Sequence, residues 1–113
     1  MEARATQKHI RVSPQKARLV VDLIRGKNAG EALSILTYTK KRVTQAVEKV
    51  LRSAIANAEQ KAEHLDVDQL VVSKAYVNEG PRSKRIRPAP MGRAFRYQRR
   101  MSHITVVVES PEA

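Results

Sequence analysis

Apolar residues recur at helical spacing after Ser13, and the flanking residues supply signals that start and end a helix. Ser13 is a favoured helix cap, and Pro14 suits the first helical position because its missing N–H needs no partner there. Gly26 can adopt the left-handed backbone that ends a helix. The repeat between them consists of Ala17, Val20, Val21 and Ile24. The pattern therefore predicts a first helix between Ser13 and Gly26.

Two further helices are predicted downstream. Asn28 can cap a short helix with Glu31 as its capping-box partner. The apolar side of this helix comprises Ala32, Leu33, Ile35 and Leu36. After a break at Thr37–Lys40, a long third helix is expected over roughly 41–62. Its apolar stripe, interpreted as core packing, comprises Val43, Val47, Val50, Leu51, Ala54, Ile55 and Ala58. The opposite, polar face carries Gln45, Lys49, Arg52, Ala56 and Glu59.

Three stretches have the character of strands. Residues 9–12 alternate weakly, whereas 70–78 and 103–109 are rich in β-branched residues. The segment 81–100 lies between the last two and has Pro and Gly near its middle. If Asn78 pairs near Ser102, the turn falls close to residues 88–92, and the segment forms two arms of one hairpin. Each arm could reach roughly 33 Å at about 3.3 Å per residue. A wholly disordered linker is the alternative interpretation.

These elements predict one α+β domain in the chain of 113 residues. We expect a small three-helix body packed on a three-stranded antiparallel sheet, formed by residues 1–80 and 101–113. A long extended basic β-hairpin, residues 81–100, projects from it. The chain has no Cys, which excludes disulfides and thiolate metal sites. No apolar run has the length of a membrane span, so a membrane partner is not expected.

The positive charge of the chain is concentrated in the hairpin segment. The formal net charge is +11, from 22 Lys and Arg against 11 Asp and Glu. Residues 81–100 contain eight Lys or Arg and no Asp or Glu, so they supply +8 and the other 93 residues +3. Such a concentration needs solvation or a polyanionic partner. The segment is expected to bind nucleic acid.

Catalytic and metal chemistry find little support in the residues. His9, His64 and His103 are scattered over three different elements, and no recognised catalytic or nucleotide-binding motif occurs. We expect neither an enzyme nor a cofactor or metal site. For His103, beside the basic segment, an RNA-binding or strand-capping role is favoured over metal ligation.

Arginine dominates the candidate RNA-binding residues of the hairpin, and its planar fork grips phosphate and stacks on bases. These residues are Arg82, Lys84, Arg85, Arg87, Arg93, Arg96, Arg99 and Arg100. Phe95 and Tyr97 would share one face of an extended arm, where they either stack on unpaired bases or pack against the facing arm. DNA is disfavoured because no recognition helix with a basic reading face follows from the pattern.

A second set of basic residues lies on the body. Lys8 and Arg11 flank the first strand, and Lys16 and Arg18 lie in the first turns of the first helix. Lys40, Lys41 and Arg42 precede the third helix, where their charge opposes the helix dipole. A neutralising anion would relieve that repulsion. Together with the hairpin, these residues predict many phosphate contacts and a steep salt dependence of binding.

Several motifs resemble one known family. The run from Ser13 to Val20, followed by Asp22-Leu23-Ile24-Arg25-Gly26-Lys27, resembles the opening of the twenty-second protein of the large ribosomal subunit in its bacterial form. Ala54-Ile55-Ala56-Asn57-Ala58 is similar to the same family, as is Gly92-Arg93-Ala94 followed by Ser102-His103-Ile104-Thr105-Val106. The resemblance runs from about residue 3 to 109, with the motifs in the family's order and spacing.

The resemblance implies a body packed against large-subunit ribosomal RNA and a ribbon that threads inward to the nascent-peptide exit tunnel. It implies a cytoplasmic ribosomal location, a role in assembly, and neighbouring ribosomal proteins and the nascent peptide as further partners of a chain that is a monomer when free. It also adds Ser13, Arg25 and Lys27 to the RNA-binding residues. The tunnel tip, where family changes affect macrolide antibiotics, corresponds to Pro88, Ala89, Pro90, Met91 and Gly92.

The chain departs from the family at this tip. The family usually has an Arg after the Pro that matches Pro88, whereas Ala89-Pro90-Met91 stands here, and Met101 replaces a common Thr. A free-standing RNA chaperone or regulatory RNA-binding protein is the alternative function. A membrane-surface or calmodulin-target protein is weaker, because residues 81–100 lack an amphipathic helical pattern.

Overall fold

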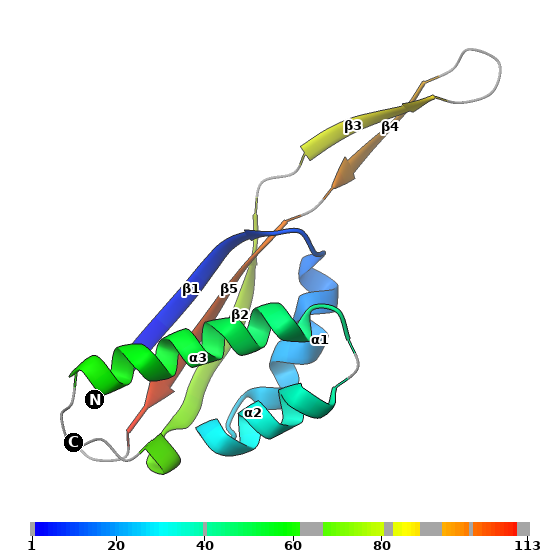
Figure 1. Cartoon of the computed structure of the whole chain (residues 1–113). Coiled ribbons are helices and arrows are strands. Elements are labelled where there is room, and N and C mark those ends of the chain that lie inside the picture. The colour runs from blue at the N-terminus through cyan, green and yellow to red at the C-terminus, as the bar shows by residue number, and fades with distance from the viewer. Residues whose placement is uncertain are drawn as a thin grey trace.

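The computed structural model shows an α+β body with a projecting two-stranded ribbon (Figure 1), as expected from the sequence. It describes residues 2–39, 41–61, 67–80, 83–88, 94–99 and 101–110. Its elements are, in order, β1 (Glu2–Ile10), α1 (Pro14–Ile24), α2 (Ala29–Tyr38), α3 (Thr44–Lys61), the 3-10 helix η1 (Val67–Gln69), β2 (Val71–Glu79), β3 (Ser83–Pro88), β4 (Ala94–Arg99) and β5 (Ser102–Glu109).

The body contains a three-stranded antiparallel sheet in which β5 lies between β1 and β2. The pairing of β1 with β5 runs from Glu2↔Glu109 to Ile10↔Ser102, and that of β2 with β5 ends at Glu79↔Ser102. The last pair lies one residue from the expected partnership of Asn78 and Ser102. The first strand begins earlier than the weak alternation at 9–12 suggested. It runs from Glu2 to Ile10 and so includes residues 2–8.

All three helices cover the same face of the sheet, and α3 crosses in front of the strands in Figure 1. On this face Ala3 pairs with Val108, which also pairs with Val72, and all three side chains are buried. The expected stripe of the third helix is buried throughout, from Val43 to Ala58. The body therefore has one core, built from small aliphatic side chains between one sheet face and three helices.

The predicted caps of the first two helices are confirmed. The Ser13 hydroxyl accepts a hydrogen bond from Lys16 N at 3.4 Å, and Asn28 Oδ1 accepts one from Glu31 N at 2.8 Å. Gly26 follows α1 with φ of 81°, a left-handed conformation that glycine adopts without steric cost. The end of α1 is thereby free to turn towards β2, where Gly26 N donates to Val72 O at 2.9 Å.

The third helix begins later than expected, at Thr44 and not near residue 41. Thr44 N and its hydroxyl both donate to Lys41 O, which closes a turn before the helix. This arrangement keeps Lys41 and Arg42 out of the first helical turn, where cations would oppose the helix dipole. Val43 is still buried, so the hydrophobic pattern extends one residue beyond the helix.

The ribbon continues from the body sheet, since β3 follows β2 along the chain and β4 precedes β5. Its strands pair antiparallel from Ser83↔Arg99 to Pro88↔Ala94. The expected two arms are confirmed, while the predicted turn at 88–92 lies, apart from Pro88, outside the described residues. The molecule measures 66 Å along its longest axis against 25 and 16 Å across.

Two side chains of α3 bind the outer edge of β1. Asn57 Nδ2 donates to Arg4 O at 2.8 Å, and Lys61 Nζ donates to Glu2 O at 3.0 Å. Sheet edges present unpaired backbone groups, which these contacts satisfy in part. Asn57 belongs to one of the family-like motifs, and its contact gives the motif a structural role.

We predict that Asn57→Ala lowers the free energy of unfolding by about 1 kcal/mol, the usual net contribution of one hydrogen bond. Urea unfolding followed by circular dichroism measures the difference. Gln60→Ala, an exposed change on the same helix, is the matched control and should be neutral. Equal stability of the two variants would contradict a stabilising role for the hydrogen bond from Asn57 to β1.

Candidate nucleic-acid interface

The ribbon strands carry the largest group of candidate RNA-binding residues. Lys84, Arg85 and Arg87 lie on β3 and Arg96, Tyr97 and Arg99 on β4, and the register pairs Arg85 with Tyr97. The other candidates of this segment lie outside the described residues, namely Arg82, Ala89, Pro90, Met91, Gly92, Arg93 and Arg100. The pairing brings cationic residues from both arms together along one narrow element.

The base of the ribbon is fastened to the body by several contacts around Gly80. Gly80 N donates to Met101 O at 2.7 Å, and His9 N donates to His103 Nδ1 at 3.1 Å. The two imidazole rings meet edge to face, with centroids 5.1 Å apart. Ser102 Oγ donates to Val12 O at 2.7 Å. We call these contacts the ribbon joint.

The ribbon joint includes an unusual backbone conformation. His9 has φ of 61°, in the left-handed region, where β1 bulges between Gln7 and Ile10. The hydrogen bond from His9 N to His103 accompanies this conformation. Strand capping and RNA binding were the two roles expected for His103. Its hydrogen bond with the backbone of the neighbouring strand is consistent with the first, and RNA binding by this side chain stays a prediction.

Basic residues near the ribbon joint are exposed. Lys8, Arg11 and Lys16 are exposed at the end of β1 and the start of α1, and none forms an ion pair within the part of the chain that the structure describes. Lys27, in the turn after α1, is exposed as well but pairs through its carbonyl with Val72, at the end of β2 away from the ribbon. Ser13 instead uses its hydroxyl as the cap of α1. Lys8, Arg11 and Lys16 thus offer free cations beside the base of the ribbon.

Arg18 and Arg25 have roles inside the fold that the sequence did not predict. Arg18 Nη2 donates to Val77 O at 3.1 Å, and Arg25 donates to Ala75 O through Nε at 3.1 Å and Nη2 at 2.6 Å. Arg25 Nη1 also pairs with Asp22 at 2.8 Å. Both arginines close the outer edge of β2 while remaining exposed at the surface.

The junction between α2 and α3 is hollowed. A cavity of about 640 Å³ is lined by Leu36, Thr37, Thr39, Lys41, Arg42, Thr44, Gln45 and Glu48. Lys41 and Arg42 bring two exposed cations to its wall without an ion pair among the described residues, while Lys40 lies outside them. Hydroxyl groups and cations together suit an anion such as phosphate.

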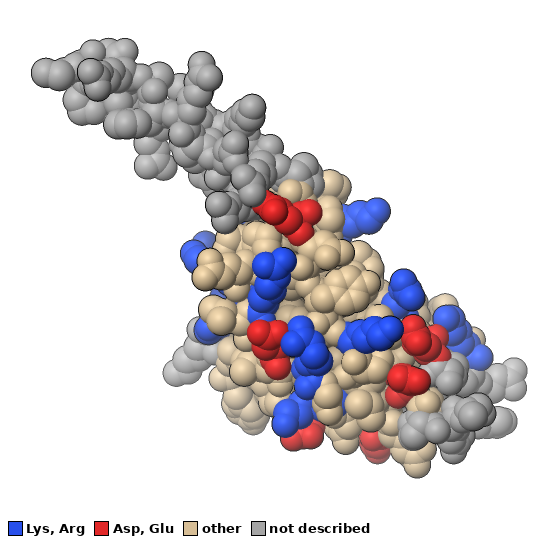
Figure 2. Space-filling view, turned by 180° about the vertical axis from the view of Figure 1, so that it is seen from behind, with Lys and Arg blue, Asp and Glu red and all other residues tan. Residues whose placement is uncertain are grey.

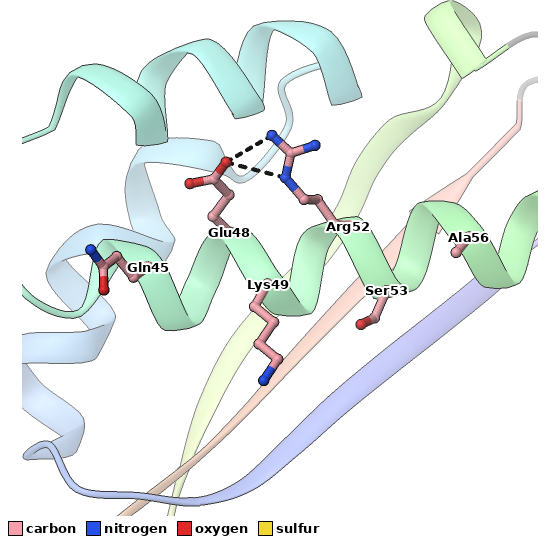
Figure 3. Close-up of a pocket in the computed structure, with 6 residues that line it drawn as sticks. All are labelled: Gln45, Glu48, Lys49, Arg52, Ser53 and Ala56. Atoms are coloured by element: carbon pink, nitrogen blue, oxygen red, sulfur yellow. Dashed lines mark hydrogen bonds and ion pairs between the residues drawn. The ribbon is translucent and has the colours of Figure 1, made fainter.

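A second, shallower hollow follows the outer face of α3 (Figure 3). Its volume is about 420 Å³, and it is lined by Gln45, Glu48, Lys49, Arg52, Ser53 and Ala56. Arg52 grips Glu48 Oε1 through Nε at 3.2 Å and Nη2 at 2.8 Å. Arg52 and Glu48 therefore neutralise each other. Lys49 beside them has no ion pair among the described residues.

Among the described residues, no three His, Asp or Glu side chains are grouped to hold a metal ion. Within the same part of the chain, no helix combines the length and apolarity needed to cross a membrane. The chemistry available to these surfaces is that of cations, hydroxyl groups and a few aromatic rings.

Comparison with known proteins agrees with the motifs. The family model for ribosomal protein L22p/L17e matches residues 5–109. The chain belongs to this family. It is 65% identical to the large ribosomal subunit protein uL22 of Solibacter usitatus over 113 residues, which span both chains completely. It is 57% identical to the uL22 protein of Oceanobacillus iheyensis over 108 residues, covering 96% of this chain and 95% of that one.

The ribbon joint of this L22p/L17e member is packed tightly at Gly80. A Cβ added there would lie 3.1 Å from His103 Cε1 and 3.2 Å from the carbonyl carbon and oxygen of Met101. Since two of these atoms belong to the backbone, they cannot move aside without shifting the strand pairing.

We predict that Gly80→Ala lowers the free energy of unfolding by about 1–3 kcal/mol, as overpacking usually does. Gly30→Ala in α2 is the matched control, because its added Cβ would meet nothing closer than Asn28 Oδ1 at 3.8 Å. The control should be unchanged or slightly more stable, since Ala favours a helix. Urea unfolding of both variants measures the contrast, and the same stability at both positions would refute tight packing at the joint.

Proposed function

We propose that this protein is a structural constituent of the large ribosomal subunit that binds large-subunit ribosomal RNA through its body and its ribbon. The observation that carries the proposal is the ribbon, a two-stranded element whose segment has eight cations and no acidic residue. An isolated ribbon is marginal in water, and its charges repel one another. A polyanion surrounding it supplies both neutralisation and packing.

The body would hold RNA at two places. Exposed Lys8, Arg11 and Lys16 flank the base of the ribbon, and Lys41 and Arg42 line the hollow between α2 and α3. Phosphates bound at both places would fix the direction in which the ribbon leaves the body. Family membership and the names of the relatives support RNA as the polyanion.

The proposal extends to the tip. By family resemblance, the ribbon enters the RNA of the subunit, and Pro88, Ala89, Pro90, Met91 and Gly92 reach the wall of the nascent-peptide exit tunnel near the macrolide region. The partners are then ribosomal RNA, neighbouring ribosomal proteins and the nascent peptide, in cytoplasmic ribosomes. Contacts with several RNA segments would also aid assembly of the subunit.

A ribbon that occupies a fixed place in the subunit should tolerate fewer sequence changes than a mobile chaperone arm. We predict that the tagged chain co-migrates with the large subunit in sucrose gradients through high salt, whereas a chain with residues 81–100 scrambled at equal charge does so poorly. A short linker in place of residues 85–95 should still permit co-migration, because the body has a core of its own between the sheet and the helices and keeps its exposed cations. Recovery of the unaltered chain only in free fractions would refute the proposal. Equal incorporation of the scrambled chain would favour the chaperone alternative.

The hollow at the α2–α3 junction gives a second prediction. The double variant Lys41→Gln and Arg42→Gln should reduce the slope of log affinity against log salt by about 1.4–1.8, because each neutralised phosphate contributes about 0.7–0.9. Filter binding to a large-subunit ribosomal RNA transcript measures the slope. The double variant Glu48→Gln and Arg52→Gln is the control, because it removes a cation together with the carboxylate that neutralises it, and it should leave the slope unchanged. An unaltered slope in the double variant would exclude phosphate contacts at this hollow.

A further inference from the structure

The face of the sheet opposite the helices carries a second cluster of RNA-compatible side chains. Buried Ala75 and Val77 point towards the helices, so Tyr76 between them faces the other way, and it is 39% exposed. The register aligns Tyr76 with Thr105 of β5, and Thr105 with Thr6 of β1. Figure 2, taken from behind the view of Figure 1, shows Lys and Arg side chains interspersed with Asp and Glu side chains and tan residues on this side of the body.

Two threonines lie beside Tyr76 on this face of the sheet. The Thr6 and Thr105 hydroxyl oxygens lie 3.0 Å apart and bind each other. The next row of this face aligns Arg4, Val107 and Lys74. Val107 is only 2% exposed, so the exposed part of this face lies over neighbours such as Tyr76 and Lys74 of β2.

Three cationic residues lie along β2 near Tyr76. Arg25 binds the carbonyl of Ala75 and Arg18 that of Val77, so the two guanidinium groups lie at the strand edge on either side of Tyr76. Lys74 stands two residues before Tyr76 on the same face and is exposed. One anion, Asp22, pairs with Arg25 at 2.8 Å. The cluster of Arg18, Arg25, Lys74 and Tyr76 keeps a positive excess.

The guanidinium groups retain capacity for a ligand. Arg18 uses only Nη2 in its contact with Val77 O, so its remaining N–H donors are available. The backbone contacts also fix where these groups lie before any ligand arrives.

We propose that this cluster is a stacking site for single-stranded RNA, in which an unpaired base lies on the Tyr76 ring and the flanking phosphates bind Arg18, Arg25 and Lys74. An aromatic ring among fixed cations is the arrangement by which proteins bind unpaired strands. A duplex keeps its bases stacked inside and cannot use the ring. The site deepens the proposed ribosomal RNA function and rests on it.

Tyrosine fluorescence tests the site directly, because the chain has no Trp and only three Tyr. In the full chain with Tyr38→Phe and Tyr97→Phe, Tyr76 is the sole emitter. Titration with a single-stranded octa-adenylate RNA should give saturable loss of emission. Lys74→Gln should raise the half-quenching concentration by about 2- to 5-fold, as expected for one exposed charge contact.

Two controls separate stacking from general electrostatic attraction. Inorganic polyphosphate, a polyanion without bases, should leave Tyr76 emission nearly unchanged. A preformed RNA duplex should do the same. Unchanged Tyr76 emission with the single strand, or equal quenching by the duplex or by polyphosphate, overturns the stacking site. Co-migration with the large subunit is measured separately, so a silent Tyr76 in a protein that co-migrates refutes this site alone.

Discussion

The pairing of β5 with both of its neighbours is the constraint on which the rest of the structure depends. β5 follows the ribbon and precedes the C-terminal end, yet it lies in the middle of the sheet between β1 and β2. Its central position buries Val106 on the helix face and Val107 on the other. The same strand carries Ser102 and His103, which fasten the ribbon joint. Core packing and ribbon placement therefore depend on one ladder of hydrogen bonds.

Local signals predicted the helices, because their caps act over a few residues. Ser13 and Asn28 each bind an N–H three residues ahead, which a sequence pattern can represent. Long-range contacts carried no such signal. Arg18 and Arg25 bind carbonyls 59 and 50 residues away, so only the folded sheet shows their structural role. The alternation around Tyr76 could have indicated its exposure, but which face the helices cover is decided by tertiary packing.

Charged residues are distributed differently in the body and in the ribbon. In the body, Glu2, Asp22 and Glu48 each lie beside an arginine of the same element or its end, and these surface pairs contribute little to stability individually. The body therefore folds on hydrophobic burial, with only part of its charge paired internally. The ribbon segment contains no acidic residue at all, so its cations have no counter-charge within the segment. The excess of positive charge is thus concentrated in the ribbon, with a smaller share on the body.

The closed edge of β2 has a consequence for the life of the protein before it meets a partner. Gly26 N and Lys27 O pair with Val72, and Arg18 of α1 and Arg25 just after it bind the carbonyls of Val77 and Ala75. An open strand edge is a template for pairing with other chains. With its carbonyls bound from within, the β2 edge offers little to an added strand, so edge-to-edge pairing of two copies through β2 is disfavoured.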